Sequence, residues 1–431
     1  MLDRLLALDT FGIKLGLDNV SRLCAALGHP EQTFTTLHVA GTNGKGSVTA
    51  MVHTALVAAG VHAGRYSSPH LVDLAERFVV GAAPVDADTL RRAAGDVLDC
   101  ADALQATDGP PVHLTFFDVT TAIAFELFRR ARVEVAVIEV GLGGRYDSTN
   151  IIAPAAGAIT SIGLDHQAWL GGTIESIAFE KAGIIKPGME IVVGALPSEA
   201  HSVVRDVARG QQARIVDAAN GARVTRDGRG GPDAVIIRTP DDRYGPLSLA
   251  LRGEHQLGNA LVAVRLLETA RRRGIHVPRE AIERGLTDVD WPGRLEVIRV
   301  QGGGQVLLDA AHNIDAAHAL ATYLGRHHPE RPALVIGVMR DKDVEGIARA
   351  LLPVVSSVVA TAADSARAIP ARELAARIMA TGPSIPVCAE PDPLKAVEQA
   401  LASSGGAACV AGSLFLVGAV RGALGHRAIL R

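Results

Sequence analysis

Aromatic residues and a surplus of positive charge are what this sequence lacks. Aromatic side chains make up 3% of the 431 residues, too few for the base-stacking platforms of single-strand-binding proteins. The 43 lysines and arginines face 46 aspartates and glutamates, so the formal net charge is −3 and no basic excess attracts a phosphate backbone. We therefore expect no nucleic-acid partner.

Cysteine is also scarce, and its spacing excludes two kinds of site. The four cysteines are Cys24, Cys100, Cys388 and Cys409. None forms a Cys-x-x-Cys pair, which argues against structural zinc and against a disulfide framework.

No long hydrophobic run suggests a membrane. The most apolar late stretch, residues 405–420, is rich in glycine and shorter than a membrane span, and we expect a buried strand and turn there. Asp3 and Arg4 follow the start methionine with no apolar core behind them, so we expect no signal peptide. These features predict a cytoplasmic protein with no membrane contact, and we expect a monomer.

The most informative stretch that is present is residues 37–47. A strand-like apolar run leads into a loop with three glycines, and residues 47–59 then follow a helical pattern. Strand, glycine loop and helix form a phosphate cradle, because glycines let backbone N–H groups approach an anion at a helix N-terminus. Lys45 can reach the outer phosphates and Ser47 can offer a hydroxyl to Mg²⁺.

This stretch departs from the standard phosphate-loop pattern at two positions. Val39 stands where that pattern has glycine, and Gly46 stands where it has serine or threonine. A plain strand-to-helix turn is therefore an alternative. Lysine and serine together at the start of the helix favour a nucleotide phosphate.

Polar side chains stand at the ends of four predicted strands. They are Ser47, Ser68, Glu139, Asp165 and His166. Because ligands bind outside the carboxyl ends of the strands in open α/β sheets, we expect these side chains to converge. Hydroxyls, a carboxylate and an imidazole suit Mg²⁺ or Mn²⁺ better than zinc. Taken singly, Glu139 could be a salt-bridged carboxylate and His166 a half-buried loop residue.

Strands and helices alternate on both sides of residues 291–294, which read as a linker. Such alternation predicts an α/β fold with a parallel sheet in each half. We expect two domains: an N-terminal P-loop-type ATPase domain at 1–290 and a smaller Rossmann-like α/β domain at 291–431. Within the first domain, β-type runs are expected at 234–239 and 247–251.

Several longer motifs resemble the folylpolyglutamate synthase/dihydrofolate synthase family. They are residues 41–47, 68–71, 139–150, 162–166, 177–183, 291–294, 309–313 and 412–416. The likeness runs in the family's order over essentially the whole chain. More distantly, the chain resembles the Mur ligases of cell-wall synthesis.

The resemblance implies roles for the matching residues. The ATP-binding residues would be Asn43, Gly44, Lys45, Gly46, Ser47, Asn259, Arg294, Asp309 and His312. The Mg²⁺ ligands would be Ser47, Ser68, Glu139 and His166, with a monovalent cation as a further candidate. The folate substrate would lie near Ile13, Lys14, Leu15, Thr115, Phe116, Phe117, Asp118, Tyr146, Asp147 and Ser148.

Lys181 matches a lysine that the family carries as a carbamate, a CO₂ adduct. From its spacing alone it would be a solvated helix lysine. Lys45, Lys181 and His166 would be the catalytic residues. Lys14 stands where some bifunctional members carry an acidic residue, so the use of dihydropteroate stays open.

The resemblance implies an ATP-dependent ligase that adds L-glutamate to a folate carboxylate through an acyl phosphate. Two alternatives remain at this point. One is a Mur-type ligase acting on a peptidoglycan precursor. The other is a nucleotide switch, for which residues 340–343 only faintly resemble a guanine-binding motif.

Overall fold

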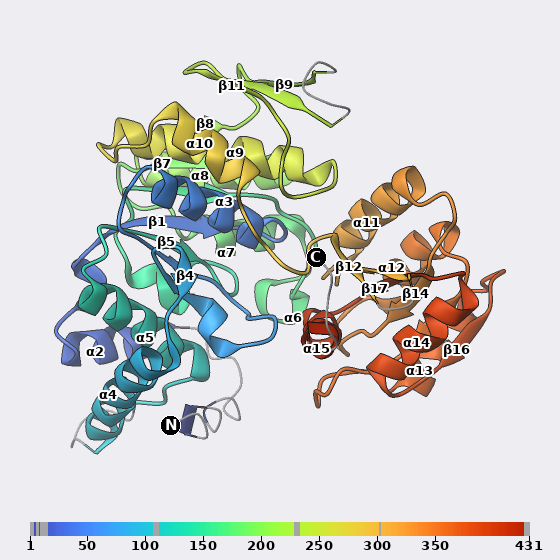
Figure 1. The fold of residues 1–431 in the computed structure, drawn as a ribbon. Helices are drawn as coiled ribbons and strands as arrows, with labels where there is room; N and C mark the ends of the chain where they lie inside the picture. The colour runs from blue at the N-terminus through green and yellow to red at the C-terminus, as the bar shows by residue number, and fades with distance from the viewer. Residues whose placement is uncertain are drawn as a thin grey trace. The chain divides into compact units, whose positions relative to one another are not determined.

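The computed structural model describes residues 4–5, 8, 16–106, 112–227, 233–300 and 303–425. The chain divides into two compact units, both of mixed α/β structure (Figure 1). Unit 1 comprises residues 1–250 and 257–290, and unit 2 comprises residues 251–256 and 291–431.

Unit 1 is built on an eight-stranded sheet in the order β4-β3-β2-β5-β1-β6-β7-β8. The strands are β1 (Thr35–Ala40), β2 (Ala63–Tyr66), β3 (Phe78–Val80), β4 (Ala83–Pro84), β5 (Val135–Glu139), β6 (Ala156–Ile159), β7 (Glu190–Val193) and β8 (Arg214–Asp217). From β2 to β8 all neighbours run parallel, as predicted, whereas β3 and β4 add an antiparallel edge. Every residue of β5, β6 and β7 is buried, as expected for strands that helices cover on both faces.

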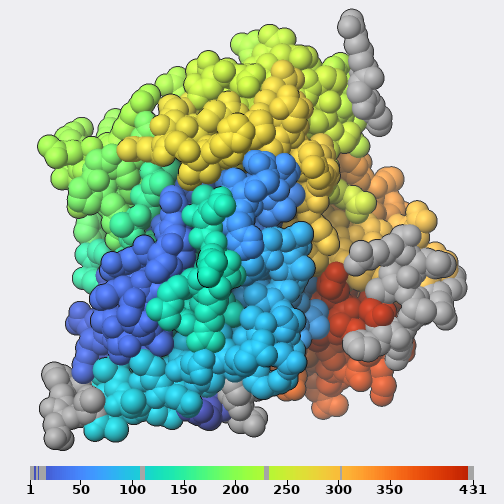
Figure 2. Space-filling model, turned by 60° about the vertical axis from the view of Figure 1, so that its left-hand side comes forward, coloured from blue at the N-terminus to red at the C-terminus, as the bar shows by residue number. Residues whose placement is uncertain are grey.

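Nine helices of unit 1 are described. They are α2 (Asp18–Ala26), α3 (Lys45–Ala58), α4 (Ala87–Gln105), α5 (Phe116–Ala131), α6 (Gln167–Leu170), α7 (Ile174–Ala182), α8 (Ser198–Gly210), α9 (His255–Arg272) and α10 (Arg279–Thr287). Helices α3 and α10 pack against each other, and Figure 2 shows the yellow α9–α10 segment directly above blue N-terminal segments on one face. Asp86 and Thr173 cap α4 and α7, because their side chains accept the backbone N–H groups of Thr89 and Ser176.

A separate antiparallel sheet in unit 1 comprises β9 (Arg223–Arg226), β10 (Val235–Arg238) and β11 (Arg243–Leu247). In Figure 1 it lies beyond α9 and α10. The strand predicted at 247–251 is wrong, because β11 ends at Leu247. Ala250 instead donates its backbone N–H to Leu286 at the end of α10.

Unit 2 has a six-stranded sheet in the order β12-β13-β17-β14-β15-β16, in which only β12 is antiparallel. The strands are β12 (Glu296–Arg299), β13 (Gln305–Leu308), β14 (Ala333–Ile336), β15 (Val358–Ala360), β16 (Val387–Ala389) and β17 (Ala407–Ala411). The helices are α11 (Ile314–His327), α12 (Val344–Leu351), α13 (Ala371–Ala380), α14 (Pro393–Ser403) and α15 (Leu414–Gly425).

The apolar stretch 405–420 contains β17, as predicted, but it continues into α15 and not only into a turn. Ser413 explains the difference, because its hydroxyl accepts the backbone N–H of Phe415 at 3.1 Å and starts a helix. Within the described residues, no helix combines the length and the apolar character needed to span a membrane.

Candidate active site

The glycine loop lies between β1 and α3, at the centre of the unit 1 sheet. Gly44 precedes α3 with a left-handed φ of +84°, and a Cβ there would lie 2.3 Å from Oδ1 of Asn259. Asn259, which only the resemblance predicted, therefore rests against this loop. The N-terminus of a helix such as α3 carries partial positive charge and is a place where an anion can bind.

The end of β6 fixes the loop from the other side. Ser161 Oγ accepts the backbone N–H of Asn43 at 2.9 Å, and Thr160 Oγ1 donates to the Asn43 carbonyl at 2.6 Å. Sequence reasoning missed both hydroxyls. The available signal was their position at the end of a strand expected to enter the same parallel sheet.

Two of the predicted catalytic residues meet on one oxygen atom of the loop. Lys45 Nζ donates to the Gly41 carbonyl at 3.0 Å, and Lys181 Nζ donates to the same carbonyl at 2.9 Å. Lys181 is buried, with 5% of its surface exposed, at the end of α7. Burial and the neighbouring Lys45 charge lower the pKa of Lys181 to about 7, against the opposing influence of Asp165 and Asp147. A large share of this amine is therefore neutral at physiological pH.

The predicted metal ligands follow four adjacent strands, β2, β5, β1 and β6. They are Ser68, Glu139, Ser47 and His166. The Ser68 backbone N–H donates to Oε2 of the buried Glu139 at 3.4 Å, which joins the ends of β2 and β5. His166, one residue after the buried Asp165, donates its backbone N–H to that carboxylate at 2.8 Å.

This donor set of two hydroxyls, one carboxylate and one imidazole suits a hard divalent cation. No group of three or more His, Cys, Asp or Glu side chains is arranged to hold a metal among the described residues. The predicted set contains only two residues of those types, so that finding does not test it.

The predicted folate residues gather where the N-terminus of α5 meets the loop after β5. Asp118 and Thr115 form a capping box, in which Asp118 Oδ2 accepts the Thr115 hydroxyl at 2.8 Å. Asp118 Oδ1 also accepts the Ser148 hydroxyl at 2.7 Å. Both oxygens of Asp118 thus hold α5 and the loop together.

Aromatic rings line the same region. A Cβ on Gly141 would lie 2.5 Å from the ring of Phe117, so this ring packs directly on the glycine. The Arg77 guanidinium lies 5.2 Å from the ring of Phe116, and the half-exposed Tyr146 ring stacks with its neighbour Arg145. Ile13, Lys14 and Leu15 lie outside the described residues.

Three predicted ATP residues belong to unit 2. They are Arg294, Asp309 and His312. Asp309 is buried at the end of β13 and accepts the backbone N–H groups of Leu295 at 3.0 Å and Ala311 at 2.9 Å. Burial raises its pKa, and the nearby charges of Arg294 and His255 oppose that rise. Sequence reasoning missed His255.

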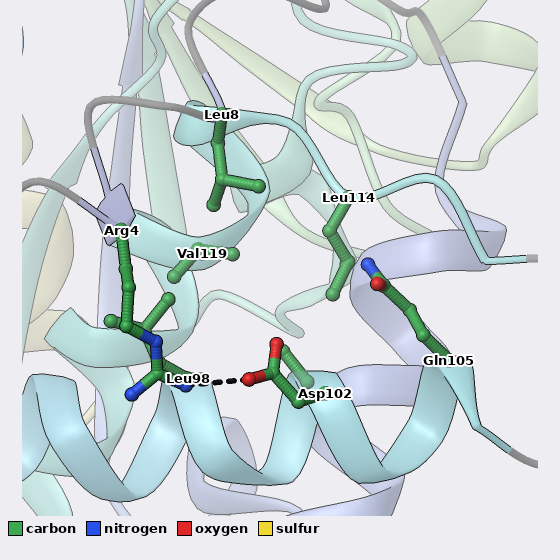
Figure 3. A pocket seen from close by; sticks show the side chains of 8 residues that line it. Arg4, Leu8, Leu98, Asp102, Gln105, Leu114 and Val119 are labelled. Atoms are coloured by element: carbon green, nitrogen blue, oxygen red, sulfur yellow. Dashed lines mark hydrogen bonds and ion pairs between the residues drawn. The ribbon is translucent and has the colours of Figure 1, made fainter.

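A cavity of about 260 Å³ lies in unit 1 between α4 and the start of α5 (Figure 3). Its lining is Arg4, Leu8, Leu98, Ala101, Asp102, Gln105, Leu114 and Val119. None of the predicted site residues lines it.

Comparison with known proteins decides the family. The Mur ligase middle domain matches residues 89–267, and the Mur ligase glutamate ligase domain matches residues 293–414. The dihydrofolate synthase/folylpolyglutamate synthase of Bacillus subtilis is 36% identical over 370 residues, which are 84% of this chain and 85% of that protein. The chain belongs to the folylpolyglutamate synthase/dihydrofolate synthase family.

Solved structures of this family agree in fold. The folylpolyglutamate synthase of Mycobacterium tuberculosis complexed with ADP matches with a TM-score of 0.90 and 32% identity, over 98% of this chain and 99% of that chain. The bifunctional synthase from Yersinia pestis complexed with AMPPNP and a manganese ion has a TM-score of 0.85 and 29% identity, over 98% and 97%. The predicted family and fold class are confirmed.

Proposed function

We propose that this protein is an ATP-dependent carboxylate–amine ligase that joins L-glutamate to a folate carboxylate and releases ADP and phosphate. The observation that carries the proposal is the meeting of Lys45 and Lys181 on the Gly41 carbonyl, at the start of α3. Lysine, helix N-terminus and glycine loop together supply positive charge to a nucleotide's phosphates. Family membership favours this chemistry over a peptidoglycan ligase and over a nucleotide switch.

The reaction needs ATP because a carboxylate oxygen is a poor leaving group. In the first step a carboxylate oxygen of the folate attacks the γ-phosphorus, and the bond to ADP breaks. In the second step the amine of glutamate attacks the acyl carbon, loses a proton and expels phosphate. The protein contributes positioning and charge stabilisation, through loop N–H groups and Lys45.

Magnesium would be held by Ser47, Ser68, Glu139 and His166. A bound Mg²⁺ would neutralise part of the negative charge on the ATP phosphates. Arg294, Asp309 and His312 remain predicted ATP residues, and the half-exposed Tyr146 with Asp147 and the α5 N-terminus remain the predicted folate site.

Lys181 has the surroundings that carbamate formation requires. A neutral amine attacks the carbon of CO₂, an N–C bond forms and the amine loses a proton. Burial keeps much of Lys181 neutral near pH 7, and the cationic Lys45 beside it favours an anionic product. We infer that Lys181 carries this adduct.

Phosphate release tests the function directly. We expect ATP turnover to require both L-glutamate and a reduced folate, and a parallel assay with dihydropteroate would separate one activity from two. Dependence on a UDP-sugar would support the Mur-type alternative. Turnover that ignores both co-substrates would exclude the ligase.

A further inference from the structure

The predicted folate-site carboxylate of Asp147 is held by residues that the proposed function does not use. Asp147 is buried, and its Oδ2 accepts the backbone N–H of Leu142 at 2.8 Å. Its Oδ1 accepts the backbone N–H of Thr149 at 3.1 Å and the Thr149 hydroxyl at 2.5 Å. Behind that hydroxyl, Nε2 of His38 lies 2.9 Å from Thr149 Oγ1.

The direction of these hydrogen bonds follows from the number of protons available. Burial raises the pKa of Asp147 to about 6, so above pH 7 its carboxylate is ionised and can only accept, and the single hydroxyl proton of Thr149 points to it. Thr149 Oγ1 must then accept a proton from Nε2–H of His38. Complete burial, with a smaller effect from Lys186, lowers the pKa of His38 to about 3, so His38 is neutral and has only this one N–H.

Burying His38 lowers the free energy of unfolding, which indicates that its hydrogen bond to Thr149 has a role. His38 is fully buried in the central strand β1, and its Nδ1 has no hydrogen-bond partner among the described residues. An unpaired buried acceptor destabilises a fold, which an apolar side chain in the same strand would avoid. The Nε2–H donor is therefore the property of His38 that an apolar side chain at this position would not supply.

We infer that His38 is a positioning residue for the folate substrate, acting through Thr149 on Asp147. This inference rests on the proposed function. By donating to Thr149, His38 directs the hydroxyl proton at Oδ1, and together with the two backbone N–H groups this fixes the rotation of the carboxylate. A fixed carboxylate matches adjacent N–H donors on a planar heterocycle, the class of group that a pterin presents.

The test uses two substitutions of nearly equal length. His38→Met removes the donor, whereas His38→Gln keeps a nitrogen donor at the same distance from the backbone. We expect His38→Met to raise the KM for tetrahydrofolate about 10-fold, with the KM for ATP and the kcat within about twofold. His38→Gln should stay within about threefold of the unmodified protein. Equal KM values for tetrahydrofolate in the two variants would overturn the inference.

A double-mutant cycle shows whether His38 acts through Thr149. Thr149→Val should raise the KM for tetrahydrofolate, Thr149→Ser should preserve it, and His38→Met should add nothing to Thr149→Val. Additive effects would contradict the relay. ADP binding and Tm identify any variant that fails to fold, in which case the Thr149 pair decides. Absence of ligation by the unmodified protein would instead reject the proposed function.

Discussion

At the scale of single residues, the account depends on the different environments of two lysines. Lys45 and Lys181 share one carbonyl acceptor, yet only Lys181 is almost fully buried. Its helical spacing predicts a solvated lysine, and the resemblance alone predicted otherwise. Sequence cannot reveal such burial, because it arises from the packing of α7 on a loop 140 residues away.

Replacing Lys181 tests the inferred carbamate. We expect Lys181→Ala to lower kcat at least about 100-fold, since an anion in the site is lost. Short carboxylic acids such as acetate should partly restore the rate by placing a carboxylate in the space. The measurement is steady-state phosphate release with and without acetate. Full activity of Lys181→Ala would show that ligation does not need a carbamate on Lys181.

Stability should depend on pH through the same side chain. The pKa of Lys181 falls from 10.5 to about 7 on folding, so between these values the unfolded chain binds a proton that the folded chain does not. Stability should therefore rise with pH over this range. Lys181→Met should be more stable than the unmodified protein at pH 7, and the gap should close toward pH 10.5 by at most about 1.4 kcal/mol per pH unit.

Urea unfolding of both proteins in CO₂-free buffer measures this gap. A gap that does not change with pH would show that Lys181 keeps an ordinary pKa.

At the scale of elements, α3 offers a matched test of the glycine loop. Gly44 and Gly60 flank this helix with φ of +84° and +81°, but only Gly44 contacts Asn259, while a Cβ at Gly60 meets open space. Both Gly44→Ala and Gly60→Ala should lose about 1–2 kcal/mol of stability. Only Gly44→Ala should weaken ATP binding, by about 10-fold or more, in a calorimetric titration. If Gly44→Ala and Gly60→Ala bound ATP with equal affinity, the glycine loop would not be part of the ATP site.

The N-terminus of α5 gives a second matched pair. Asp118 completes the capping box of α5 with Thr115 and holds Ser148, whereas Asp86 is the N-cap at the exposed start of α4. Alanine at either position should cost about 1 kcal/mol by loss of the cap. We expect only Asp118→Ala to raise the KM for the folate substrate. A similar increase in Asp86→Ala would mean that the effect is general destabilisation.

Elements were predictable where local signals agreed and not where distant contacts decided. Caps at Asp86 and Thr173 and the buried run of β5 could be predicted from the sequence. The end of β11 depended on a hydrogen bond from Ala250 to α10, which has no local signature. Thr160 and Ser161 were missed for the same reason, since only the pairing of β1 with β6 brings them to the loop.

At the scale of the whole molecule, the sequence motifs predicted the family, but they did not predict which side chains contact one another. The fold class could be predicted because strands and helices alternate in both halves. Ile13–Leu15 remain outside the described residues, so the N-terminal part of the predicted folate site stays a prediction. The ligase account requires that one ATP, one glutamate and one folate carboxylate react together.

The fate of the carboxylate oxygen tests this claim most directly. If the enzyme phosphorylates the acid, folate labelled with ¹⁸O in its reacting carboxylate must pass one labelled oxygen to each phosphate released. Mass spectrometry of the phosphate after a single-turnover reaction with ATP and L-glutamate is the measurement. The account predicts one ¹⁸O per phosphate for a fully labelled acid, and unlabelled phosphate formed together with the glutamylated product would contradict it.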